Sequence, residues 1–169
     1  GMNWATLNNT PFARYKHFTH EGGISTPLIA HWPAGIAATR RGTLEKQPGH
    51  LVDVMATCVD LAGAKYPTEF KGHAIEPRQG VSLRPAFAGE PLGRKLPIFW
   101  EHEGNKAARE GQWKLVMRHK QPWQLFDMEA DRTEQSDVIK DHPQIASRLA
   151  AAWDAWAERT YVDKWNGPD

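Results

Sequence analysis

The stretch YKHFTHEGGISTP, Tyr15–Pro27, is the most informative part of this 169-residue chain. It places a lysine, two histidines and a carboxylate directly before two adjacent glycines and an apolar run. Adjacent glycines let the backbone approach a ligand closely or adopt positive φ. Lys16 carries a compact, strongly hydrated charge that suits an oxyanion such as phosphate or sulfate. The pattern therefore indicates an anion-binding loop, although a plain turn beside a solvated lysine would have the same local spacing.

Composition limits the classes of protein to which the chain can belong. It has 40% hydrophobic and 24% charged residues, which is ordinary for one soluble domain. A net charge of +1 argues against a nucleic-acid binder, because phosphate backbones require a basic stripe. No apolar run is as long as a membrane span, so we expect no membrane partner. Gly1 before Met2 is typical of a tag-removal scar and no secretory signal follows, while a single cysteine leaves the compartment undecided.

The first half of the chain predicts few regular elements. The polar segment 1–25 is expected to be loop-like, and the apolar run 27–32 is expected to be an interior strand of a larger sheet. Four residues then repeat at helical spacing up to a glycine cap and predict a helix with a buried apolar stripe: Leu51, Met55, Cys58 and Ala62. Cys58 would be an inert core residue on that stripe. The proline- and glycine-rich segment 64–95 predicts an irregular excursion.

The second half predicts a compact α+β unit. Strands are expected at 96–100, 107–109, 113–118 and 123–127, and their short links favour an antiparallel meander. A helix should begin at Pro143, which suits a first helical position. Its apolar face would consist of Ile145, Leu149, Trp153 and Trp156. The predicted architecture is thus a C-terminal four-stranded antiparallel sheet packed by a C-terminal helix.

Three histidines between residues 17 and 31 can be interpreted as structural or as functional. His20, next to Glu21, could orient a substrate or hydrogen-bond within the turn, and the local role is favoured. His17 adjoins Lys16 and could line the same pocket or be exposed. His31, inside the expected strand, is predicted to be a core histidine.

The run EHEGN, 101–105, resembles a metal cluster. Successive side chains on a strand point to opposite faces, so His102 and its glutamate neighbours should not all bind one ion. We therefore predict no metal ligands in this chain, and a zinc site here is disfavoured.

Several segments together resemble the sulfatase family. The likeness begins with NTPFARYK at 9–16 and continues through HEGG at 20–23 and TPLIAHWP at 26–33. It extends to LVDVMAT at 51–57, GVSL at 80–83, FWEHEGN at 99–105, GQWKLV at 111–116 and LFDM at 125–128. These segments follow the order of the C-terminal part of an arylsulfatase-like enzyme, and the resemblance implies that the chain is part of an α/β fold of the alkaline-phosphatase-like kind.

The resemblance implies roles for five residues. A lysine before the Glu-Gly-Gly turn contacts the sulfate ester in the family, and Lys16 is the matching residue. We predict Lys16 as catalytic and His17, His20, His102 and Asn105 as substrate-binding. The last two residues are expected at the mouth of the active site.

Two parts of the family's chemistry are missing from this sequence. Sulfatases make their nucleophile by oxidising the Cys or Ser of a Cys/Ser-x-Pro-x-Arg motif to formylglycine. No cysteine or serine here is followed by both the proline and the arginine. The resemblance also implies calcium in an intact relative, held by Asp and Asn ligands from segments before Lys16, and those segments are absent.

We therefore expect the C-terminal portion of an arylsulfatase-like sulfuric ester hydrolase that is inactive alone. Residues 1–95 would be the remnant of the large α/β catalytic domain, and residues 96–169 a small subdomain. Its partners would be a sulfate ester, if an N-terminal region completes it, and a second copy of the chain. The alternative is a non-catalytic anion- or carbohydrate-binding accessory module. Intact relatives are often exported, but the localisation of this chain stays open.

Overall fold

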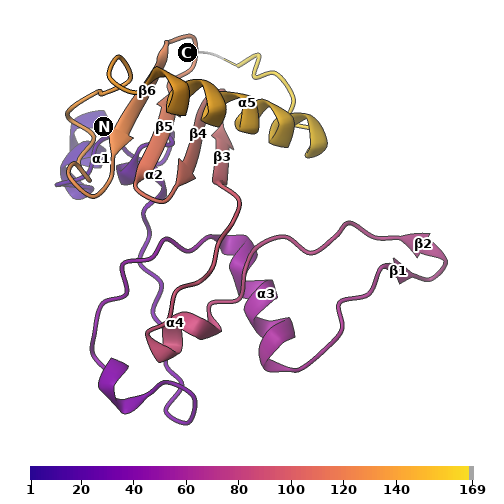
Figure 1. Ribbon diagram of the computed structural model, residues 1–169. Helices are drawn as coiled ribbons and strands as arrows, with labels where there is room; N and C mark the ends of the chain where they lie inside the picture. Colours follow the sequence, from indigo (N-terminus) through magenta and orange to yellow (C-terminus); the bar gives the residue numbers. More distant parts are fainter. Residues whose placement is uncertain (168–169) are drawn as a thin grey trace. The chain divides into compact units, whose positions relative to one another are not determined.

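The computed structural model describes residues 1–167 and divides into two compact units (Figure 1). One unit joins Gly1–Pro27 to the segment that begins at Leu96, and the other is Leu28–Lys95. The expected division into residues 1–95 and 96–169 differs from this arrangement, because the first 27 residues pack with the C-terminal sheet.

The sheet of the first unit is a four-stranded antiparallel meander in the order β3-β4-β5-β6. Its strands are β3 (Ile98–His102), β4 (Asn105–Glu110), β5 (Trp113–Met117) and β6 (Trp123–Asp127). The predicted meander is confirmed. The strand expected at 107–109 is longer than predicted, because β3 and β4 are joined by a two-residue turn and pair from that turn as far as Ile98 and Arg109.

Helix α5 (Pro143–Arg159) crosses one face of this sheet, as predicted (Figure 1). Its buried residues are Ala146, Leu149, Trp153 and Ala157, which pack on Ala108, Leu115 and Leu125 of the sheet. Pro143 occupies the first turn, where a missing N–H costs nothing. This apolar layer makes the sheet and α5 one packing unit.

The N-terminal segment lies against the opposite face. Two short helices, α1 (Met2–Asn8) and α2 (Glu21–Ile24), flank the loop that carries Lys16. Thr19 Oγ1 donates a hydrogen bond to the Lys106 carbonyl, 2.9 Å away, and so fixes the loop on β4. A second small core on this face contains Ala107, Val116, Phe126 and Met128.

The second unit, Leu28–Lys95, has little regular structure. It contains a 3₁₀ turn (Ala38–Arg40), α3 (Leu51–Leu61), the two-stranded β1 (Glu69–Phe70) and β2 (His73–Ala74), and α4 (Arg84–Ala88). Asp53, which is fully buried, accepts hydrogen bonds from the backbone N–H of His50 and Val81 and pairs with Arg94. The predicted helix and the irregular proline-rich segment are thus confirmed.

Two predictions for residues 27–32 are wrong. Residues 27–32 form no strand, and Leu28 and Ile29 are 67% and 89% exposed, because no strand of the described residues pairs with them. His31 is accordingly exposed and is not a core histidine.

The apolar stripe of α3, which was predicted to be buried, is exposed instead, so Cys58 is not a core residue. Leu51 and Met55 are 82% and 56% exposed, and Cys58 is exposed too. The buried face carries Asp53, Ala56 and Thr57 instead, because Asp53 and Thr57 bind the backbone of the segment around Val81 and Leu83. Hydrogen bonding therefore overrides the apolar periodicity. No helix among residues 1–167 is both long and apolar enough to cross a bilayer.

Candidate functional site

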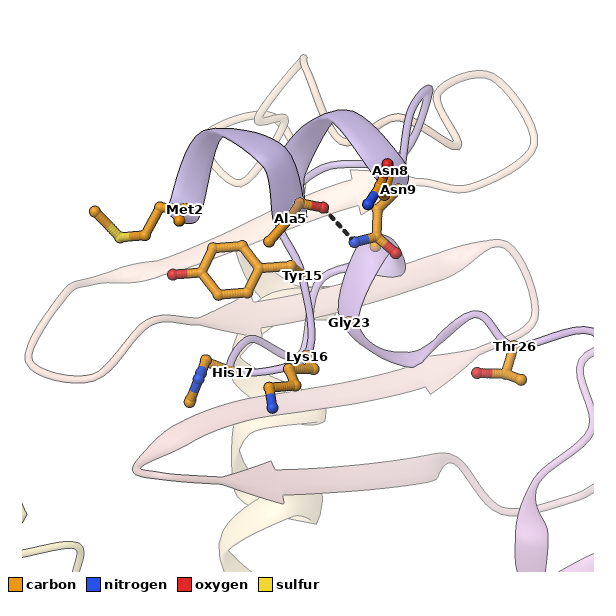
Figure 2. A pocket seen from close by; sticks show the side chains of 11 residues that line it. Met2, Ala5, Asn8, Asn9, Tyr15, Lys16, His17, Gly23 and Thr26 are labelled. Atoms are coloured by element: carbon orange, nitrogen blue, oxygen red, sulfur yellow. Dashed lines mark hydrogen bonds between the residues drawn. The ribbon is translucent and has the colours of Figure 1, made fainter.

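An open pocket of about 510 Å³ lies between α1 and the loop that carries Lys16. Its lining includes Tyr15, Lys16 and His17 from the loop, Gly22 and Gly23 from α2, and Thr26. Figure 2 shows Lys16 and His17 side by side on the loop; α1 contributes Met2, Ala5 and Asn8, and Asn9 follows directly after the helix. Lys16 is exposed, so its ammonium group is available to a solvent-borne anion.

Gly22 and Gly23 must be glycines, because the backbone of the preceding loop lies too close to leave room for a Cβ. A Cβ on Gly22 would lie 2.3 Å from the Arg14 carbonyl oxygen, and one on Gly23 would lie 1.9 Å from that of Phe18. The Gly22 N–H also donates to the Ala13 carbonyl at 2.8 Å. The turn is therefore folded back on the loop before it, and this fold-back positions Lys16 at the pocket.

A buried ion cluster anchors the turn to the sheet. Glu21 is 3% exposed, and its Oε1 lies 2.8 Å from Lys114 Nζ, which is fully buried on β5. The same Nζ lies 2.8 Å from Glu134 Oε1, and Glu134 Oε2 accepts a hydrogen bond from the Glu21 N–H at 2.8 Å. One lysine of the sheet thus joins two carboxylates from distant parts of the chain.

The two carboxylates of this cluster differ in proton affinity. Burial alone would raise the pKa of Glu21, but the charge and hydrogen bond of Lys114, with help from Arg132 and Arg109, hold it below its usual value. For Glu134, burial dominates and raises the pKa in spite of Lys114. Because Lys114 supplies one positive charge for two carboxylates, Arg132 completes the pairing through a contact of 3.1 Å to Glu21 Oε2.

His20 is buried rather than exposed to the pocket. It is 5% exposed and forms the N-cap of α2. Burial, together with the charges of Lys114, Arg14 and Arg118, lowers the pKa of His20 to about 3, so its imidazole is neutral at pH 7. His20 thus lies beneath the loop. Its contact with substrate stays a prediction.

His17 and His102 meet, although they are far apart in the sequence. Their rings stack with centroids 6.2 Å apart, and Glu103 joins them, because its Oε2 lies 2.5 Å from His17 Nδ1. The hydrogen bond from His17 is the main cause that lowers the pKa of Glu103. His102 is mostly exposed, with its Nε2 3.8 Å from Glu103 Oε1.

Successive side chains on a strand point to opposite faces, which would separate Glu103 from His102. A hairpin turn at Glu103 removes this restriction. His102 pairs with Asn105, so Glu103 and Gly104 form a two-residue turn. Both have positive φ, 51° and 76°, which is the pattern of a type I′ hairpin turn. Glu103 has left the strand, and the alternation of faces no longer separates its side chain from that of His102.

Asn105 lies beneath this turn and is 6% exposed. Its Nδ2 donates to the carbonyl oxygens of His17 at 2.8 Å and His102 at 3.0 Å, and its Oδ1 accepts from the His119 N–H. The structure therefore uses this side chain to hold the backbones of two predicted site residues. Its predicted contact with substrate stays untested.

Sequence analysis missed the residues that support the turn. Lys114 and Glu134 are an ordinary lysine in a strand and an ordinary glutamate in a polar stretch. The signal that could have revealed Lys114 was its place between apolar neighbours, because a lysine on the inner face of a strand needs a buried partner. No such signal exists for Glu134.

The residues present do not fit the calcium that the resemblance implies. Calcium takes six to eight oxygen ligands. Among residues 1–167, the group of three side chains whose ligand atoms converge is His17, His102 and Glu103, and two of its three donors are nitrogens. A calcium site of the expected kind would need ligands from outside this chain.

Comparison with known proteins gives the family. Residues 13–155 match the family described as "N-sulphoglucosamine sulphohydrolase, C-terminal". The chain belongs to the sulfatase family. Similar sulfatases include an uncharacterized one of Schizosaccharomyces pombe, 27% identical over 96% of this chain and 30% of its own length. Mouse N-acetylgalactosamine-6-sulfatase is 34% identical over 73% of this chain and 22% of its own length.

Solved sulfatase-like structures share the fold. The chain superimposes with a TM-score of 0.72 on Ps i-CgsB, which was crystallised in complex with k-i-k-neocarrahexaose. The two are 31% identical, and the match covers 88% of this chain and 32% of that one. The chain thus spans about a third or less of the sulfatases that it matches.

The predicted resemblance and fold class are confirmed by these matches. The matched family is described as a sulphohydrolase and the relatives as sulfatases, which are enzymes that act on sulfate esters. The described residues place Lys16 at an open pocket, on the loop before a turn that is held by buried ion pairs.

Proposed function

We propose that this chain is the C-terminal portion of a sulfuric ester hydrolase and that Lys16 binds the sulfate group. The observation that carries the proposal is the position of Lys16, exposed at a pocket on a turn that buried ion pairs fix to the sheet. A fixed cation stabilises charge on sulfate oxygens without reorganising during the reaction. His17, which lines the same pocket, would contact the organic part of the substrate.

The chain alone should have no turnover. Lys16 is neither a nucleophile for sulfur nor a metal, and the sequence lacks the formylglycine motif. The nucleophile and the calcium of an intact enzyme would come from a region outside this chain. The similarity to N-acetylgalactosamine-6-sulfatase makes a sulfated sugar a reasonable class of substrate to test first.

Sulfate binding can be tested on the chain as it is. Amide signals of residues 15–23 should shift when sodium sulfate is added at constant ionic strength, and they should not shift with sodium chloride. Lys16→Ala should abolish the shifts, whereas Lys65→Ala, which removes an exposed lysine of the other unit, should leave them unchanged. Shifts that persist in Lys16→Ala would contradict the role of Lys16.

The genomic reading frame upstream of Met2 tests the enzyme assignment. A Cys/Ser-x-Pro-x-Arg motif and an Asp-Asn-Gly there would establish a sulfatase. The longer protein should then hydrolyse an aryl sulfate, and Lys16→Ala should lower kcat by about 10²–10³, as loss of one oxyanion donor does. An upstream region without either motif would favour the alternative, an anion- or carbohydrate-binding accessory module.

A further inference from the structure

We propose that His17, His102 and Glu103 form a binding site for a divalent transition metal of the zinc class. The three side chains offer two imidazole nitrogens and a carboxylate oxygen, and their ligand atoms all lie within 4.8 Å of one another. This inference goes beyond the proposed function, which places its metal outside this chain.

The donor set suits zinc. Two histidines and one glutamate are a set that binds zinc while leaving a fourth position open. Zinc bonds of about 2.0–2.2 Å place tetrahedral ligand atoms roughly 3.4 Å apart. His17 Nδ1 and Glu103 Oε2, at 2.5 Å, would have to move apart by about 0.9 Å, and Glu103 Oε1 and His102 Nε2, at 3.8 Å, would approach by about 0.4 Å. The side chain of His102 is 54% exposed and has room for this rotation.

The backbone beneath the three ligands is already fixed. Asn105 holds the carbonyl groups of His17 and His102 through one buried amide. Gly104 keeps the turn tight, since a Cβ there would lie 2.3 Å from His119 Nδ1 and its φ is 76°. A site whose backbone is held before binding loses less entropy when the metal arrives.

The charge of Lys16 should have opposite effects on metal binding and on sulfate binding. Lys16 adjoins His17 and lines the same pocket, so its positive charge acts on the cluster. That charge repels a cation and attracts an anion. Removing it should therefore weaken sulfate binding and strengthen metal binding, and the two proposals can fail independently.

Titration of chelator-treated protein with zinc chloride tests the proposal. Calorimetry in a buffer free of sulfate and phosphate should show one equivalent bound. His102→Ala and Glu103→Gln should each weaken binding at least tenfold, because loss of a ligand costs no less than loss of an outer partner. His31→Ala is the matched control, since it removes an exposed histidine of the other unit and should leave binding unchanged.

Cobalt(II) gives a second readout. The wild-type protein should develop the intense visible absorption of four-coordinate Co²⁺, and His102→Ala should not. Circular dichroism checks that each variant is folded, and His102→Ala alone decides the matter if Glu103→Gln does not fold. Equal affinity in wild type and His102→Ala, absence of zinc binding to the wild type, or displacement of zinc by millimolar calcium would overturn the assignment.

Discussion

Lys114 Nζ on β5 lies 2.8 Å from Glu21 Oε1, across 93 residues of sequence. Lys114 therefore holds the Glu-Gly-Gly turn against the sheet. The position of this turn places Lys16 at the pocket. Because Glu134 contacts the same ammonium group, one lysine pairs with two buried carboxylates, and Arg132 supplies a further positive charge to Glu21. Formation of the pocket is thus coupled to packing of the N-terminal segment on the sheet.

Replacement of this lysine should be strongly destabilising. Lys114→Met should lower the free energy of unfolding by about 3–5 kcal/mol, because it removes the buried ammonium group that Glu21 and Glu134 share and leaves Arg132 to pair with Glu21. Lys140→Met, which changes an exposed lysine of the same unit, should alter stability by less than about 0.5 kcal/mol. Urea denaturation measures both values. Equal stability of the two variants would show that the buried cluster contributes nothing net.

Acid should destabilise the protein through His20. The folded-state pKa of about 3 lies below the ordinary value of 6.5, so the unfolded chain binds the proton first as the pH falls. The contribution of His20 is complete above pH 6.5 and is lost as the pH falls toward 3. At pH 5 the loss relative to pH 7.5 should be about 2 kcal/mol, at about 1.4 kcal/mol per pKa unit.

The variant His20→Gln isolates this effect. Its unfolding free energy should fall less than that of the wild type between pH 7.5 and pH 5, a window that lies above the usual pKa of 4.5 for Glu21. Urea denaturation at each pH gives the two curves. Parallel curves would mean that His20 is accessible to protons in the folded protein.

The contact between α5 and the sheet should supply much of the stability of the first unit. Leu149 is fully buried between them, so Leu149→Ala should cost about 2–5 kcal/mol through lost burial and the cavity left behind. Leu96→Ala removes the same atoms from a residue that is 73% exposed and should cost far less. Thermal unfolding distinguishes them, and similar melting temperatures would contradict the assigned core.

The exposed apolar face of α3 predicts self-association. Leu51 and Met55 are 82% and 56% exposed, and Ile29 of the same unit is 89% exposed. Exposed apolar groups of this kind favour a self-complementary contact. Light scattering at micromolar concentration should show a dimer, and Met55→Glu should shift it toward monomer, whereas Lys65→Glu should not. A strictly monomeric wild type would contradict this prediction.

Local pattern was enough to predict the C-terminal elements. The four strands and α5 are built from neighbouring residues, and the helical spacing of Leu149 and Trp153 identifies the buried face of α5. The continuous Glu-Gly-Gly motif also led to the prediction of Lys16 as a site residue, and Lys16 lines the pocket, although its role stays a prediction. Such features depend on short-range geometry, which the order of residues sets directly.

The apolar periodicity gave a wrong prediction where hydrogen bonds to residues distant in the sequence decide which face of a helix is buried. On α3 the apolar stripe that includes Met55 is exposed, because Asp53 and Thr57 bind backbone N–H groups of a segment more than twenty residues away. Hydropathy carries no information about such partners. The exposed run at Leu28 and Ile29 shows the complementary failure, since a strand needs a neighbour that local sequence cannot name.

The sequence by itself determined the meander, the helix that covers it and the position of the lysine turn, because periodicity and glycine spacing are local properties. Only the tertiary structure decided which residues support the turn and which meet His17. Lys114 comes from 93 residues after Glu21, and Glu103 from 86 residues after His17. Contacts between residues so far apart arise from chain reversal at the hairpins and from packing of the N-terminal segment on the sheet, and no local pattern encodes them.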